Sequence, residues 1–109
     1  MITYDLRTSS DLKDILNDVI DKANKIKNEI EDGKEINTDD VLALLSQAEH
    51  FIFTGSVVYG INLDYREEIG GELNRYKRAI RNNTADVGDM YIAVCYTLEL
   101  FKKLKKLYV

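Results

Sequence analysis

The sequence predicts an all-α protein, a small four-helix bundle formed by a single domain that spans residues 1–109. The chain contains no proline, so no residue brings the fixed ring and missing backbone donor that break a helix interior. Apolar residues recur at the three- and four-residue spacing of one helix face. Capping and turn-forming residues separate the four segments that show this spacing, at about residues 10–32, 38–53, 62–81 and 84–107.

The first expected helix runs from about Ser10 to Asp32. Ser9 or Ser10 can cap its start, and Gly33 can end it in the left-handed conformation. Ile15 and Ile20 widen its apolar stripe, which favours burial in a bundle over a bare two-stranded coil. The stripe itself has the spacing of a heptad seam: Leu12, Leu16, Val19, Ala23, Ile26 and Ile30.

The second helix is expected to begin at Thr38 and to continue to about Phe53. Asn82 and Asn83 end the third helix, and Thr84 caps the fourth. The third helix carries one apolar stripe: Tyr65, Ile69, Leu73, Tyr76 and Ile80. The fourth carries another: Val87, Met90, Tyr91, Val94, Leu98, Phe101 and Leu104. Together the stripes supply the core of a bundle.

Two segments depart from simple helical patterning. Residues 56–65 alternate apolar with small or polar residues, so they fit either a short strand or a loop that leads into the third helix; we favour the loop. Gly70 and Gly71 fall inside the third helix, where two glycines cost about 2 kcal/mol relative to alanines. We expect a closely packed neighbouring helix there, with a kink or a ligand against the backbone as the alternatives.

Composition excludes several classes of site. The only histidine is His50 and the only cysteine is Cys95, which removes Cys/His zinc sites and the paired Glu-x-x-His motifs of di-iron bundles. We expect His50 to be a partly buried structural residue. No apolar run is long enough for a membrane span, and the first residues do not resemble a signal peptide, so a cytoplasmic location is expected. Residues 1–40 hold eleven acidic and six basic side chains, whereas residues 65–109 hold six and nine.

Two pairs of carboxylates are the candidate metal ligands. Glu68 and Glu72 share a face of the third helix, and Asp86 and Asp89 share a face of the fourth. A turn between these helices is expected to bring the four groups together, and such oxygen ligands suit Mg²⁺ or Mn²⁺. A metal held there would bind a polyphosphate and activate water. The basic residues expected to neutralise its phosphates are Arg75, Arg78 and Lys102.

The segments EEIGGEL and AIRNNTADVGDMYIAVCYTL resemble the MazG-like, all-helical nucleoside triphosphate pyrophosphohydrolases over about residues 65–100. That family has Glu-x-x-Glu on one helix and Glu-x-x-Asp on the next. Asp86 and Asp89 match the second motif, with Asp in place of the first Glu. Glu68 and Glu72 depart from the first motif, because three residues rather than two separate them. The resemblance implies Mg²⁺-dependent cleavage between the α- and β-phosphates of a nucleotide.

Two functions therefore stay open. The first is a protein that acts by binding a macromolecular partner, as a regulator or inhibitor, since catalytic residue types are few and tyrosines are plentiful. Small proteins rich in Lys, Asn and Ile are frequent in phages and other mobile elements of low-GC bacteria. The alternative is the Mg²⁺-dependent pyrophosphohydrolase, or a degenerate relative that keeps its fold. The net charge of −4 argues against nucleic-acid binding, because it repels the phosphate backbone.

A protein partner would meet two candidate surfaces. One is the acidic face of the first helix, and the other is the segment between the second and third helices. Self-association is also expected, because the heptad seam and the apolar residues 56–63 exceed what one small bundle is expected to cover. The residues predicted to contact a partner are Asp11, Asp14, Asp18, Asp21, Tyr59 and Tyr65.

Overall fold

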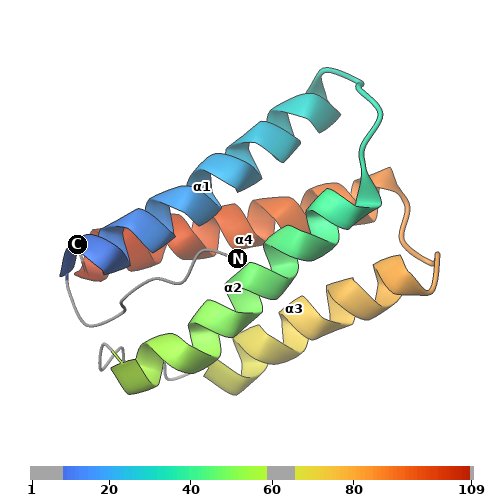
Figure 1. Cartoon of the computed structure of the whole chain (residues 1–109). Helices are drawn as coiled ribbons and strands as arrows, with labels where there is room; N and C mark the ends of the chain where they lie inside the picture. Colours follow the sequence, from blue (N-terminus) through green and yellow to red (C-terminus); the bar gives the residue numbers. More distant parts are fainter. Residues whose placement is uncertain (1–8, 59–65, 109) are drawn as a thin grey trace.

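The computed structural model describes residues 9–58 and 66–108, and the regular secondary structure in these ranges is helical. The helices are α1 (Ser9–Glu31), α2 (Thr38–Val58), α3 (Arg66–Arg81) and α4 (Val87–Tyr108). Each helix runs antiparallel to the next, so the chain crosses the length of the bundle four times in alternating directions (Figure 1). The most extensive contacts join α1 to α4 and α2 to α3. The predicted four-helix bundle is confirmed.

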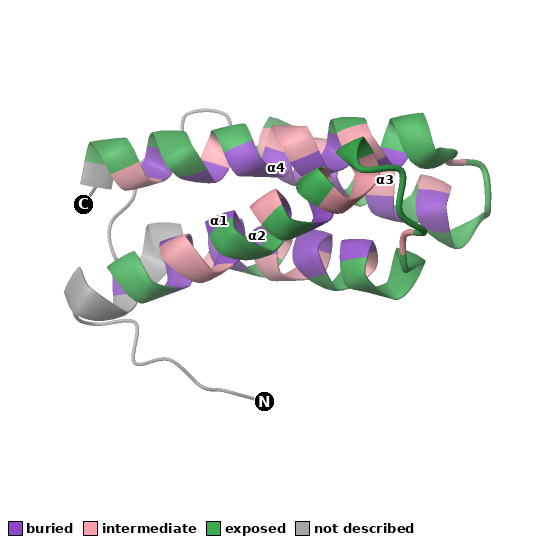
Figure 2. Cartoon of the chain, turned by 90° about the horizontal axis from the view of Figure 1, so that it is seen from above, coloured by how far each residue is buried: buried purple, intermediate pink, exposed green. Residues whose placement is uncertain are grey.

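Each helix turns a buried, mainly apolar stripe inward and exposed residues outward (Figure 2). Phe51 of α2 meets Phe101 of α4 across the core, with ring centroids 5.4 Å apart. The heptad seam of α1 is buried from Leu12 to Ile26 by the other helices of the same chain. It therefore does not supply the exposed surface on which self-association was predicted. None of the four described helices combines the length and apolar character needed to cross a bilayer.

The two ends predicted at Gly33 and Asn83 have the same backbone geometry. Gly33 has φ of 73° and Asn83 has φ of 56°, so both adopt the left-handed conformation that ends a helix. The amide of Lys34 donates to the carbonyl of Glu29 at 2.9 Å, which closes α1. The amide of Thr84 closes α3 in the same way, through a 2.9 Å bond to the carbonyl oxygen of the residue five positions earlier.

Three predicted boundaries need correction. α2 continues to Val58 rather than ending near Phe53, and the Thr54 hydroxyl donates to the carbonyl of His50 at 2.9 Å within the helix. Thr84 does not cap α4, because its hydroxyl donates to the last turn of α3 at 3.1 Å. α4 consequently begins at Val87 instead of residue 84. Of the segment predicted as a loop, residues 56–58 are helical; residues 59–65 lie outside the described ranges.

The two glycines of α3 have different surroundings. A Cβ atom built on Gly70 would lie 2.9 Å from Cζ of Phe53, whereas one on Gly71 would meet nothing within 4 Å. The ring of Phe53 on α2 thus lies directly against the backbone of α3 at Gly70. The close helix packing predicted for this pair is confirmed at Gly70 and absent at Gly71.

Gly71→Ala is expected to raise the free energy of unfolding by about 1 kcal/mol, because alanine favours helix and the new methyl group enters open space. Gly70→Ala should gain much less, since the Phe53 ring must move aside. Urea denaturation followed by circular dichroism measures both variants. Equal gains for the two would show that the ring does not press on Gly70. Adding Phe53→Ala to Gly70→Ala should recover the missing increment.

Candidate functional site

The four candidate metal ligands lie at two ends of the bundle. Glu68 and Glu72 occupy the first two turns of α3, whereas Asp86 and Asp89 lie at the start of α4. Because these helices are antiparallel, their starts are at opposite ends (Figure 1). No group of three or more His, Cys, Asp or Glu side chains in the described ranges is placed to hold a metal ion. The structure brings Asp86 and Asp89 together and leaves Glu68 and Glu72 apart from them.

Asp86 and Asp89 form a reciprocal cap at the start of α4. The Asp89 amide donates to Oδ1 of Asp86 at 2.8 Å, and the Asp86 amide donates to Oδ2 of Asp89 at 3.1 Å. This is the arrangement of a capping box, with Asp in both side-chain positions. The three-residue spacing that indicated a metal pair is therefore also the spacing that satisfies two backbone donors at the helix start.

Asp86→Ala is expected to lower the free energy of unfolding by about 1 kcal/mol, because the Asp89 amide loses its acceptor. Asp86→Asn should cost only a few tenths of a kcal/mol, since an amide oxygen caps nearly as well. Thermal unfolding with and without Mg²⁺ separates this role from metal binding. A metal ligand would instead give a Mg²⁺-dependent melting temperature that Asp86→Asn abolishes.

The three cations predicted to bind phosphates have separate surroundings. Arg75 donates to Oε2 of Glu72 at 2.8 Å, and this hydrogen bond holds the pKa of Glu72 below its ordinary value. Nζ of Lys102 lies 4.0 Å from a carboxylate oxygen of Glu99. Arg78 is exposed and has no ion-pair partner in the described ranges. The nucleotide-hydrolysing function stays a prediction from the resemblance.

The acidic residues of α1 divide between two roles. Asp14 and Asp21 are exposed, whereas Asp18 faces α2 and accepts a 2.8 Å hydrogen bond from Nε2 of Gln47. Nζ of Lys22 completes a ring of contacts, 3.0 Å from Asp18 and 3.1 Å from Oε1 of Gln47. Asp18 therefore joins two helices rather than serving a free acidic surface. The remaining residues predicted to contact a partner have side chains outside the described set: Asp11, Tyr59 and Tyr65.

Asp18→Asn is expected to lower the free energy of unfolding at pH 7 by about 1 kcal/mol. Partial burial acts to raise the pKa of Asp18, but the bonds from Gln47 and Lys22 outweigh it and hold that pKa below the ordinary value of 3.8. The stabilisation is thus complete above 3.8 and is lost as the pH falls through the folded-state pKa. Denaturation of both proteins across the acid range should show the difference closing; Asp21→Asn, at an exposed position, is the control.

The outward side of α2 is a surface that the sequence reasoning missed. Ala43, Ser46, His50 and Phe53 follow each other at three- and four-residue spacing opposite the buried stripe of this helix, and we call them the α2 face. Ala43 and His50 are exposed, and Phe53 is 48% exposed. After its first turn, α2 has only Glu49 and His50 as ionisable residues. In the sequence, this surface is indicated by the scarcity of charged residues in the run VLALLSQAEHFIF.

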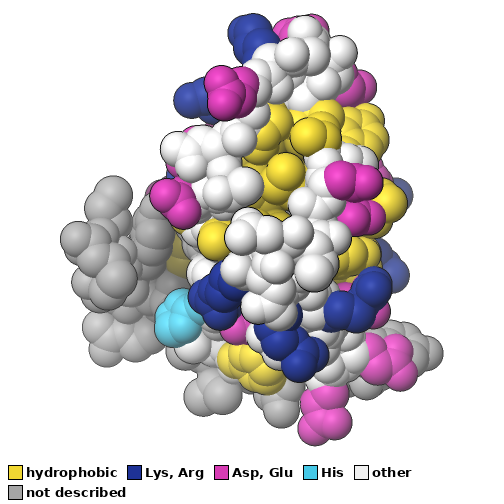
Figure 3. Space-filling model, turned by 90° about the vertical axis from the view of Figure 1, so that its right-hand side faces the viewer, with side chains coloured by type: hydrophobic (Ala, Val, Ile, Leu, Met, Phe, Trp, Pro, Cys, Tyr) yellow, Lys and Arg dark blue, Asp and Glu magenta, His cyan; other side chains and the backbone are white. Residues whose placement is uncertain are grey.

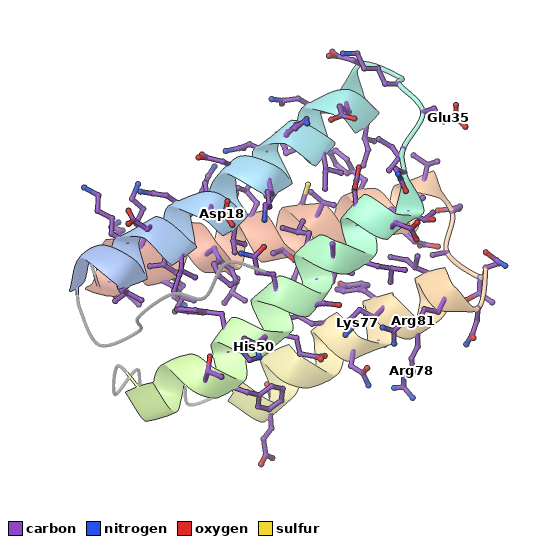
Figure 4. All side chains as sticks on the ribbon, viewed as in Figure 1. Asp18, Glu35, His50, Lys77, Arg78 and Arg81 are labelled. Carbon is purple, nitrogen blue, oxygen red and sulfur yellow. The ribbon has the colours of Figure 1, made fainter. Side chains whose placement is uncertain are left out.

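The burial predicted for His50 is wrong, because it belongs to this outward stripe and not to the stripe that meets the core. Figure 4 shows His50 on the side of α2 that faces the viewer, and in Figure 3 the histidine lies at the surface beside lysine or arginine side chains.

Basic side chains border the α2 face on both sides. On α1, Lys22 and Lys25 line a hollow of about 210 Å³ that reaches Ala43, and the acidic residues Glu29 and Asp40 line it too. On α3, Lys77 is mostly buried and pairs with Glu49 at 3.3 Å. Arg81 lies one turn further along the same side of α3 (Figure 4). The α2 face is therefore an uncharged strip between two charged edges.

Comparisons with protein-family models, with curated proteins and with solved structures found no match for this chain.

Proposed function

We propose that this protein acts by binding another protein chain, with the α2 face as its docking surface. The observation that carries the proposal is the uncharged, outward stripe Ala43–Ser46–His50–Phe53 on a helix whose opposite side is already buried in the core. Depletion of charge distinguishes the centre of a protein interface from the rest of a surface. A helix that is apolar all round is typical of one that is covered on every side, and α2 approaches this composition because its outward stripe also has few charged residues.

The composition of the stripe fits helix packing in particular. Ala43 and Ser46 are small, so a partner helix can approach the backbone of α2 closely. Phe53, whose ring packs on one side against Gly70 of α3, is still 48% exposed and adds contact area at one end of the stripe. The outer positions of α1 are different: Asp14, Asp21 and Asn28 keep that surface polar and hydrated. A regulator or inhibitor would bind its target protein through such a surface.

A photoreactive amino acid at position 43 tests the proposal in cells that express the protein. We expect irradiation to join position 43 to a defined protein, in higher yield than the same residue at Asn28, an exposed position on α1. Ser46→Glu, which adds charge to the centre of the stripe, should remove the product. If the yield at 43 is no higher than at 28, the α2 face is not a docking surface.

A further inference from the structure

We infer that the occupant of the α2 face is a second copy of this chain, bound through the same face about a two-fold axis near Ala43. This inference rests on the proposed docking role of the α2 face and adds the identity of the partner. It is carried by charges that border the face and find no partner within the described part of the chain.

Four such charges lie at the border. Asp39 and Asp40 are exposed in the first turn of α2, and Lys25 and Arg81 are exposed on the neighbouring helices. None of the four takes part in an ion pair in the described ranges. Among the other charged residues beside the stripe, Lys22 pairs with Asp18 at 3.0 Å and Lys77 pairs with Glu49 at 3.3 Å. Glu29 lines the same hollow as Lys25 and takes part in no ion pair in the described ranges.

The acidic border residues and the basic border residues are centred at different levels along the axis of α2. Lys77 contacts Glu49, and α3 is antiparallel to α2, so Arg81 lies about one turn nearer the start of α2 than Glu49 does. Lys25 lines the hollow that reaches Ala43 on the other side of α2, and Asp40 of the same chain borders that hollow at the end nearer the start of α2. The acidic pair thus occupies the first turn of α2, and the basic pair flanks the turn after it.

This pattern is complementary to itself. When two copies of α2 face each other antiparallel about Ala43, positions 39 and 40 of one copy come opposite positions 46 and 47 of the other. Asp39 then falls within one helical turn of Arg81 of the partner subunit, and Asp40 within one turn of Lys25 of the partner subunit. The two-fold axis repeats both contacts, as in any isologous interface.

A partner with a single sign of charge would satisfy only two of the four groups and would repel the other two. A second copy satisfies all of them. The small side chain of Ala43 at the axis also lets the two helices approach without a clash.

Charge reversal in two matched variants tests this geometry. The first carries Asp39→Lys and Asp40→Lys, and the second carries Lys25→Glu and Arg81→Glu. Each variant alone places like charges opposite each other, so sedimentation should show the single-chain mass, 12.5 kDa. An equal mixture pairs opposite charges at all four contacts, so it should restore the mass of two chains. Restoration also demonstrates that both variants fold, which circular dichroism checks independently.

The wild-type protein should sediment as a dimer that dissociates as salt is raised, because the border charges are exposed to screening. Asp14→Lys with Asp21→Lys, which reverses two exposed charges on the outer side of α1, should leave the dimer intact. A monomeric wild type at the highest soluble concentration, or a mixture of reversed variants that stays monomeric, would overturn the inference.

The crosslink at position 43 distinguishes failure of the dimer inference from failure of the proposed docking role of the α2 face. A product with twice the chain mass supports both statements. A product with a different protein, together with a monomeric wild type, retains the docking role of the α2 face and overturns the second copy as its occupant. No specific product at 43 removes both.

Discussion

Phe101→Ala is expected to lower the free energy of unfolding by about 3–5 kcal/mol, the largest effect of any single substitution considered for this chain. The Phe101 side chain is fully buried and its ring packs against Phe51 at 5.4 Å between centroids. Removing it eliminates the contacts of an aromatic ring and leaves a cavity between α4 and α2. Because a domain of this size is stable by only about 5–15 kcal/mol, the variant should be partly unfolded at 37 °C if the parent stability is near the lower bound.

Urea denaturation at 25 °C, followed by circular dichroism at a helical wavelength, measures this loss. Ile92→Ala is the matched control, because Ile92 lies on the same helix but is 55% exposed. The control should change the free energy of unfolding by less than about 0.5 kcal/mol. A loss below about 1 kcal/mol for Phe101→Ala would mean that the ring pair is not at the centre of the core. Phe101→Leu should retain most of the stability, since it keeps the site filled.

The second large effect concerns the ion pair between Glu49 of α2 and Lys77 of α3. Removing one partner should lower the free energy of unfolding by a different amount from removing the other. The side chain of Lys77 is 10% exposed, whereas that of Glu49 is 24% exposed. Glu49→Ala leaves a mostly buried ammonium group without a counter-charge and is expected to cost about 2 kcal/mol or more. Lys77→Met replaces the charge with an apolar side chain of similar length. The remaining carboxylate still reaches water, so this variant should stay within about 1 kcal/mol of the parent.

The double variant Glu49→Ala with Lys77→Met completes a thermodynamic cycle for this pair. We expect it to be more stable than Glu49→Ala alone, because no unpaired charge is left in the interior. Urea denaturation of the four proteins at pH 7 gives the interaction free energy directly. Equal losses for the two single variants would contradict the explanation based on unequal burial, because each charge would then cost the same when it is left alone.

Much of the fold was predictable because its signals are local. The apolar spacing of α1 identified the residues that are buried, and Gly33 identified the left-handed end of that helix. Thr84 was assigned to the wrong helix for a physical reason. A threonine between two helices can serve the end of one or the start of the next, and here Asp86 already caps α4 while Thr84 closes α3.

The candidate site was less predictable, because it depends on register between helices. Glu68 and Glu72 do share a face of α3, but a short turn pairs residues that are equally distant from it. The ring contact of Tyr76 with Tyr96, with centroids 5.9 Å apart, shows this register. Residues near the start of α3 therefore meet the later turns of α4, and Asp86 lies at the other end. Spacing within one helix contains no information about that distance.

The α2 face was not predicted from the sequence for a different reason. A helical pattern is read by locating its apolar stripe, and the remaining positions are assumed to be hydrated. In α2 those positions include Ala43 and Phe53, which are not typical of a hydrated surface. The useful signal was the near absence of charge on the side of the helix that does not meet the core.

The pairing of α1 with α4 has a consequence for how the chain is made. The packing of α2 against α3 joins helices that are neighbours in sequence, whereas the main partner of α1 is the last of the four helices. During synthesis the side of α1 that packs against α4 therefore stays uncovered until α4 has emerged from the ribosome. A ribosome that pauses within residues 87–108 would prolong the interval in which the nascent chain is open to aggregation and to chaperones.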